Sequence, residues 1–124
     1  MRVLRITALL SCLLLLAGCH SAHVLATVSN HTSQPILLFE VDYPSASFGG
    51  DTLAPGADFH YKFKVLGDGK MSLSYTDNEH KIHKSQGPYL NEKADGPLHI
   101  TIASDGVHWQ TSPKTTMQAP PGSE

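Results

Sequence analysis

The chain has 124 residues, with nine basic residues against eleven acidic ones and a formal net charge of −2. This length allows one domain. The basic residues are few, and a nucleic-acid-binding protein needs lysine and arginine clustered on one face, so the composition argues against that class of protein.

The first 18 residues have the layout of a secretory signal. Arg2 and Arg5 form a basic start, residues 6–16 are almost unbroken apolar sequence, and the small pair Ala17 and Gly18 follows. The apolar run is short for a membrane span, which needs about 20 residues. We therefore expect a signal helix over 1–18 that is removed, with a retained N-terminal anchor as the alternative.

The tetrapeptide Leu-Ala-Gly-Cys at residues 16–19 resembles the lipobox of bacterial lipoproteins. The resemblance covers only the first nineteen residues. It implies cleavage before Cys19, a covalent lipid on the Cys19 thiol, and attachment to a membrane of the bacterial cell envelope. His20 stands where aspartate is associated with inner-membrane retention, so the resemblance implies the outer membrane in an organism with two membranes.

Loss of the signal also removes Cys12, so no disulfide is expected. The lipid would turn the Cys19 thiol into a thioether, which is a poor metal ligand. This argues against a metal site built from Cys19 with His20 and His23. The remaining chain keeps seven lysines against eleven acidic residues, a formal charge of about −4 that disfavours electrostatic capture by anionic lipid. We expect a lipidated tether over 19–25, a folded domain over 26–111 and a disordered tail over 112–124.

The folded domain alternates apolar and polar residues with a period of two, which is typical of strands with one wet face. Residues 58–65 are the clearest case, because every second side chain is aromatic or valine. Short strands with Gly, Pro or Asp turns between them favour a β-sandwich. We predict an all-β fold, an antiparallel sandwich of about seven strands, immunoglobulin-like or transthyretin-like, with a small barrel as the alternative. The expected strands are 25–30, 35–43, 58–66, 70–77, 80–85, 97–103 and 106–111.

Histidine is the unusual component of the composition, and imidazole suits zinc and copper. His80 and His83 have an H-x-x-H spacing that serves a metal only in a turn or a helix, because on a strand they face opposite sides. His60 and His99 both face outward by alternation and would meet if their strands were neighbours. These four residues are the candidate metal ligands, and the alternative is a set of solvated surface histidines.

The link over residues 42–51 is long and carries two aromatic side chains, Tyr43 and Phe48. Loops at the end of a sandwich often bind other molecules, so this segment is a candidate binding loop. The alternative is that both rings fold back onto the edge of the core.

Nothing in the sequence has the spacing of a catalytic motif, and the carboxylates are spread mostly over turns, where they cap the backbone. We therefore expect no enzyme and no cofactor beyond the covalent lipid. The expected function is a membrane-anchored binding or interaction module whose partner is an envelope protein or a cell-wall component. A histidine-dependent metal-binding lipoprotein is the alternative.

Overall fold

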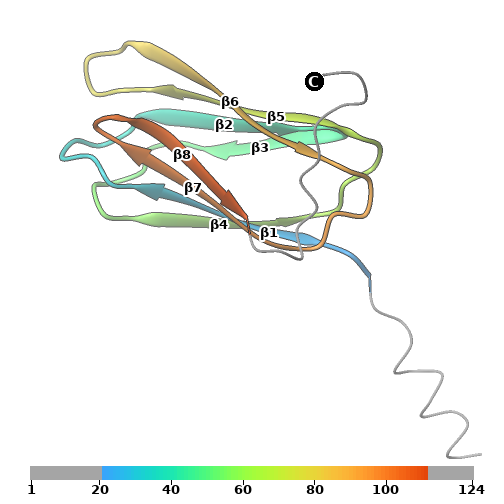
Figure 1. Cartoon of the computed structure of the whole chain (residues 1–124). Coiled ribbons are helices and arrows are strands. Elements are labelled where there is room, and N and C mark those ends of the chain that lie inside the picture. The colour runs from blue at the N-terminus through green and yellow to red at the C-terminus, as the bar shows by residue number, and fades with distance from the viewer. Residues whose placement is uncertain (1–20, 112–124) are drawn as a thin grey trace, which may run out of the picture.

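The computed structural model describes residues 21–111, which form eight β-strands and no helix (Figure 1). The strands are β1 Val24–Asn30, β2 Leu38–Tyr43, β3 Ala46–Gly50, β4 Asp58–Phe63, β5 Gly69–Thr76, β6 Ile82–Leu90, β7 Gly96–Ala103 and β8 Gly106–Thr111. The predicted all-β sandwich is confirmed, with one strand more than expected. The predicted signal helix, Cys19 and the predicted disordered tail lie outside the described residues.

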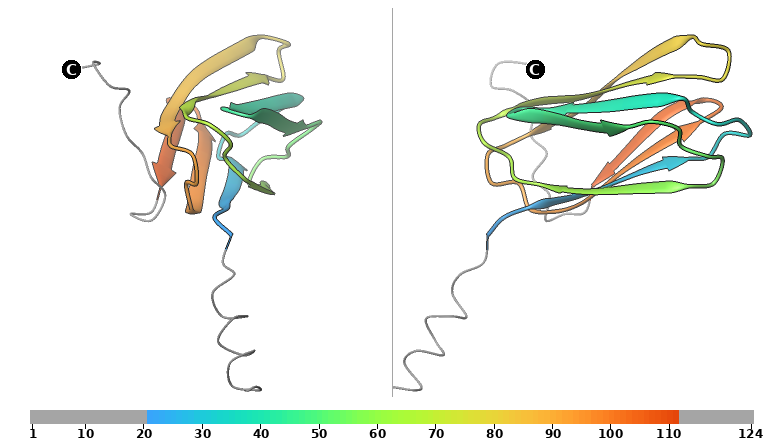
Figure 2. Two further views of the ribbon diagram at one scale, coloured as in Figure 1. Left: turned by 90° about the vertical axis from the view of Figure 1, so that its right-hand side faces the viewer. Right: turned by 180° about the vertical axis from the view of Figure 1, so that it is seen from behind.

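Two four-stranded sheets pack face to face, in the orders β4-β1-β7-β8 and β3-β2-β5-β6 (Figure 2). Every pairing is antiparallel except that of β1 with β7, which is parallel. The prediction of a purely antiparallel sandwich is therefore wrong for this one pair. An immunoglobulin sandwich keeps its first, second, fifth and fourth strands in one sheet. Here the first and fourth strands lie in one sheet and the second and fifth in the other. This order excludes the immunoglobulin form and leaves the transthyretin-like form of the two that were predicted.

The core lies between the sheets and is built by the alternation seen in the sequence. On β1 the inward residues Val24, Ala26 and Val28 are at most 2% exposed, while Leu25 between them is half exposed. The other strands contribute in the same way, and the largest fully buried apolar side chains are Ile36, Met71, Leu73, Leu90, Leu98, Ile100 and Ile102. Each such side chain contributes about 1.5–3 kcal/mol by leaving water, so this layer is the main source of stability.

β3 is the strand that the sequence did not predict, because residues 42–51 were expected to be a link. Instead the chain turns at Pro44 and Ser45, and Ala46 pairs with Tyr43 in an antiparallel hairpin. Alanine, serine and two glycines around one phenylalanine give almost no strand signal in the sequence. The single inward side chain, Phe48, is 7% exposed and is enough to fix the face of the strand.

The largest difference in the remaining strand boundaries is at β6. The predicted strand covers 80–85, but β6 runs from Ile82 to Leu90, and its pairing with β5 shifts register opposite Lys70–Ser72 and then resumes. Val24 and Leu25 were assigned to the tether, but they are already paired in β1. Within residues 21–111 no helix has the length and apolar character to cross a membrane.

Candidate functional site

The Tyr43–Phe48 segment is a strand hairpin and not a loop, which corrects the expected conformation of this segment. Phe48 stacks on Tyr61 with ring centroids 4.4 Å apart, and Tyr43 stacks on Phe63 at 4.1 Å. Burial is the main cause that raises the pKa of the Tyr43 hydroxyl, followed by the neighbouring Tyr61. The rings thus close the side of the sandwich between β3 and β4, as the alternative interpretation expected.

His60 and His99 lie on the outer face of one sheet but do not meet. Both are in register with Thr27 on β1, which lies between their strands. Two strand spacings of about 4.8 Å separate them, and the ring nitrogen Nδ1 of His60 is 3.1 Å from the Thr27 hydroxyl. His60 and His99 are therefore not cross-strand neighbours, and the His60 ring contacts Thr27 instead.

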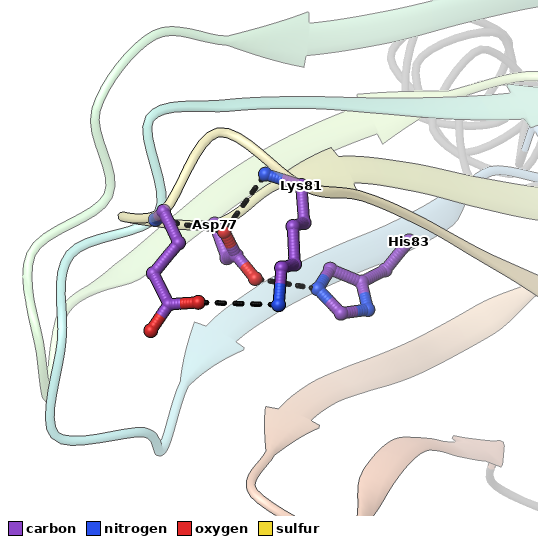
Figure 3. A network of polar contacts seen from close by, with 4 residues as sticks. Asp77, Lys81 and His83 are labelled. Carbon is purple, nitrogen blue, oxygen red and sulfur yellow. Dashed lines mark hydrogen bonds and ion pairs between the residues drawn. The ribbon is translucent and has the colours of Figure 1, made fainter.

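His80 lies in the β5–β6 turn with a positive φ of 62°, whereas His83 lies on β6. The Nε2 of His83 is 2.7 Å from the Asp77 carboxylate (Figure 3), and the imidazole stacks on Tyr75 at 4.7 Å. Asp77 also accepts hydrogen bonds from the backbone N–H groups of Glu79 and Lys81. The His83 side chain therefore joins β6 to the β5–β6 turn through Asp77, and we call this Asp77–His83 bond the histidine clamp.

The bond from His83 is the largest cause that holds the pKa of the Asp77 carboxyl below its ordinary value, followed by the bond from the Lys81 N–H. The next hairpin repeats the arrangement. His108 Nε2 lies 2.8 Å from Asp105 and lowers the pKa of that carboxyl. Residues 21–111 hold no group of three or more histidine, cysteine, aspartate or glutamate side chains that suits a metal ion.

Sequence reasoning missed a polar face on the outer side of β2, β5 and β6. Glu40 and Asp42 point to the same side of β2, and the register places Ser74 and Ser72 beside them. The Ser72 hydroxyl is 3.3 Å from Asp42, and the pKa of the Glu40 carboxyl is raised by a hydrogen bond to Asp42 and by the charge of that residue. Lys84 on β6 lies next to Ser74. The Glu-x-Asp spacing on a strand was the available signal, because residues two apart share a face.

A shallow hollow on this face is lined by Glu40, Asp42, Ser72–Ser74 and Lys84–Gln86. We call the outer surface that contains this hollow the β2–β5–β6 face. Its charged side chains are exposed and its serines are half-buried, so the hollow is lined with hydrogen-bonding groups that solvent reaches. Such a surface suits contact with a polar partner more than enclosure of a small apolar ligand.

The comparisons with known proteins bear on the fold alone. No family model matches the chain, and no curated protein matches it. A similar solved structure is an NMR structure of a protein from Eubacterium rectale, with a TM-score of 0.53 and 14% sequence identity. The similarity covers 72% of this chain and 87% of that one. It agrees with the two-sheet sandwich described above.

Proposed function

We propose that the chain is a lipid-anchored protein of the bacterial cell envelope whose β-sandwich is a non-catalytic binding module. The anchor is a covalent lipid on Cys19, added when the first 18 residues are removed. The module is held at a membrane surface, on the outer membrane where the organism has two. Its partner is an envelope protein or a cell-wall component.

The observation that carries the proposal is the Leu-Ala-Gly-Cys box at residues 16–19, which ends a basic and then apolar N-terminal segment. Acyl chains contribute about 0.8 kcal/mol for each buried CH₂, so two or three chains hold a soluble domain firmly where one does not. The position of the box relative to the domain supports the same proposal. The first paired residue is Val24, five positions after Cys19, so a lipid would be joined to the domain by a short segment.

His60, His83 and His108 each contact an acceptor or donor in a neighbouring strand or turn, so these imidazoles are engaged within the fold. Metal binding is the second function expected from the sequence, and β1 lies between the strands of His60 and His99. The carboxylates and serines of the β2–β5–β6 face are instead grouped on one surface, so we assign the binding activity to that face.

The anchor is tested in a bacterial host that processes lipoproteins, by incorporation of an alkyne-labelled fatty acid into the full chain. We expect label and membrane association in the wild type, and loss of both in Cys19→Ala. Cys12→Ala is the matched control, because it removes the other cysteine within the segment that is cleaved, and it should label normally. Equal labelling of wild type and Cys19→Ala would refute the anchor.

The binding face is tested separately with the double variant Glu40→Gln and Asp42→Asn. Chemical cross-linking in intact cells should give a defined adduct with the wild type and much less with the double variant. Asp58→Asn is the control, because Asp58 is an exposed carboxylate at the start of β4 in the other sheet. An unchanged adduct in the double variant would remove the β2–β5–β6 face from the proposal and leave the anchor intact.

A further inference from the structure

The segment that follows Cys19 enters the sandwich at one end, which we call the tether end. Figure 1 shows β1 starting there, at the same end of the sandwich as the β2–β3 turn, the β4–β5 loop and the β6–β7 loop. The pairing agrees, because Val24 is in register with Phe63 at the end of β4 and with Gly96 at the start of β7. The turns β5–β6 and β7–β8 lie at the opposite end.

The three connections at the tether end are bonded to one another. The Leu66 N–H donates to the Ser45 hydroxyl over 3.3 Å, which ties the β4–β5 loop to the β2–β3 turn. The Lys93 N–H donates to the carbonyl of Val65 over 3.4 Å, which ties the same loop to the β6–β7 loop. The Glu92 N–H donates to the Asp68 carboxylate and repeats that link. The backbones of the three connections are therefore held together as one surface.

The tether is fastened to this surface at His23. Its N–H donates to Asp95 over 3.1 Å, and its carbonyl accepts from the Gly96 N–H over 3.0 Å. Only three residues lie between Cys19 and His23. Four Cα steps span at most about 14 Å whatever their conformation. A lipid on Cys19 would thus hold the tether end close to the bilayer surface.

Leu66 is a large apolar side chain that this end exposes to solvent. It is 57% exposed, although its neighbour Val65 is fully buried and its own N–H is held by Ser45. A single exposed leucine is ordinary on a protein surface. Leu66 is singled out by its position, because it lies on the hydrogen-bonded β4–β5 loop at the end where the lipid on Cys19 would be attached. Leu25, which is 51% exposed, adds a second apolar side chain near the tether.

Formal charge differs between the two ends of the sandwich. The tether end has four lysines against four acidic residues, a charge of 0, and the opposite end has one lysine against five, a charge of −4. The residues of the tether end are Lys62, Lys64, Lys70, Lys93, Asp42, Asp68, Glu92 and Asp95. Those of the opposite end are Lys81, Asp51, Asp58, Asp77, Glu79 and Asp105. An anionic bilayer attracts lysines near its surface and repels carboxylates, so it favours the orientation with the tether end inward.

We propose that the tether end is a membrane-facing surface and that Leu66 enters the headgroup region of the bilayer. The inference rests on the proposed anchor at Cys19. The lipid supplies the attachment, while Leu66 and the lysines set the orientation. The domain consequently stands on the membrane with the β5–β6 and β7–β8 turns pointing away from it.

The test uses the full chain, lipidated in the host and reconstituted in vesicles of phosphatidylglycerol and phosphatidylcholine with nitroxide-labelled lipid. Leu66→Cys and Ile82→Cys each provide one thiol for a fluorophore, because the Cys19 thiol carries the lipid. Ile82 is the matched control, since it is 68% exposed and begins β6 at the opposite end. Both sites are exposed, and circular dichroism checks that both variants fold.

We expect the fluorophore at position 66 to be quenched several-fold more than that at position 82, with a smaller difference in vesicles of phosphatidylcholine alone. Equal quenching of two variants that both float with the vesicles would overturn the orientation and leave the anchor standing. If neither variant floats, the anchor fails and the orientation fails with it. The two proposals are thereby distinguished.

Discussion

The indole nitrogen of Trp109 donates a hydrogen bond to the Ser85 hydroxyl over 3.0 Å, and this bond joins β8 of one sheet to β6 of the other. The same indole covers Gly87, where an added Cβ would lie 2.7 Å from the ring. Both strands are at the edges of their sheets. The contact therefore closes the side of the sandwich opposite the aromatic rings of β3 and β4.

Replacing Gly87 by alanine is expected to destabilise the domain. The backbone of Gly87 has no positive φ, so the cost comes from the indole of Trp109, which must shift to admit the methyl group. Overpacking of this kind costs about 1–3 kcal/mol. Urea unfolding of residues 21–111, followed by circular dichroism, measures the change in the free energy of unfolding.

A double-mutant cycle with Trp109→Ala identifies the source of that cost. In the Trp109→Ala background the clash is absent, so Gly87→Ala should cost little. An equal cost in both backgrounds would show that the strain does not come from the indole.

Asn30 is fully buried and all its side-chain hydrogen-bonding atoms have partners. Its amide nitrogen donates to the carbonyls of Gln34 and Leu53, both at 2.9 Å, and its oxygen accepts from the Thr32 N–H and hydroxyl. These bonds hold the β1–β2 connection to the segment that contains Leu53. Asn30→Ala should lower the free energy of unfolding by about 2–4 kcal/mol, since each bond contributes about 1 kcal/mol. Thr32→Ala removes one partner only and should cost less.

Asn30→Asp gives a pH-dependent version of the same experiment. The new carboxylate would face two carbonyl oxygens, so its pKa in the folded state is raised above the unfolded value of about 3.9. A carboxyl whose pKa is raised by folding lowers the free energy of unfolding once it ionises. This loss of stability is absent below the pKa of the unfolded state and complete above the pKa of the folded state. Urea midpoints of the variant should therefore fall, relative to wild type, as the pH rises from 4 to 7. A constant difference over that range would contradict the role of the amide as a donor.

The period of two in the sequence predicted most of the fold because burial enforces it. Residues 58–63 and 97–103 alternate clearly, and both form strands in those places. β3 was missed because its small residues leave only Phe48 to mark the inward face. The parallel pairing of β1 with β7 joins residues about 70 positions apart, and no local pattern encodes that choice.

Whether the outward histidines are neighbours could not be predicted for a related reason. Alternation placed His60 and His99 on the correct face, but whether they meet depends on strand order, and β1 lies between them. Asp77 lies just after β5, and its bond to His83 depends on the length and register of the hairpin. Sequence pattern thus predicts which face a residue occupies more securely than which residues are its neighbours.

Asp77 is expected to stabilise the domain only while it is ionised. Its pKa is lowered in the folded state, first by the bond from His83, so the stability it contributes is present above the unfolded pKa and is lost as the pH falls through the folded pKa. Asp77→Asn keeps an oxygen for the N–H groups of Glu79 and Lys81 but removes the charge. Wild type should therefore be more stable than the variant at pH 5, and the difference should vanish near pH 2.

Asp105→Asn is the companion measurement, because Asp105 has the same kind of bond to His108 and a pKa lowered in the same direction. Asp51→Asn serves as the control at the same end of the sandwich, since it lies outside both hairpins. If Asp51→Asn removes as much acid sensitivity as Asp77→Asn, general charge repulsion and not the histidine clamp governs the transition.

Glu40 should show the opposite sign. Its pKa is raised, first by the hydrogen bond to Asp42 and then by the charge of that neighbour, so ionisation of both carboxyls is unfavourable in the folded state. The resulting loss of stability is absent below the pKa of the unfolded state, about 4.3, and complete above the pKa of the folded state. Glu40→Gln should therefore be more stable than wild type at pH 7, with no advantage at pH 3. Added salt should shrink the gain at pH 7, because both side chains are accessible to solvent. A gain that is independent of pH would mean that packing, and not repulsion from Asp42, separates the two proteins.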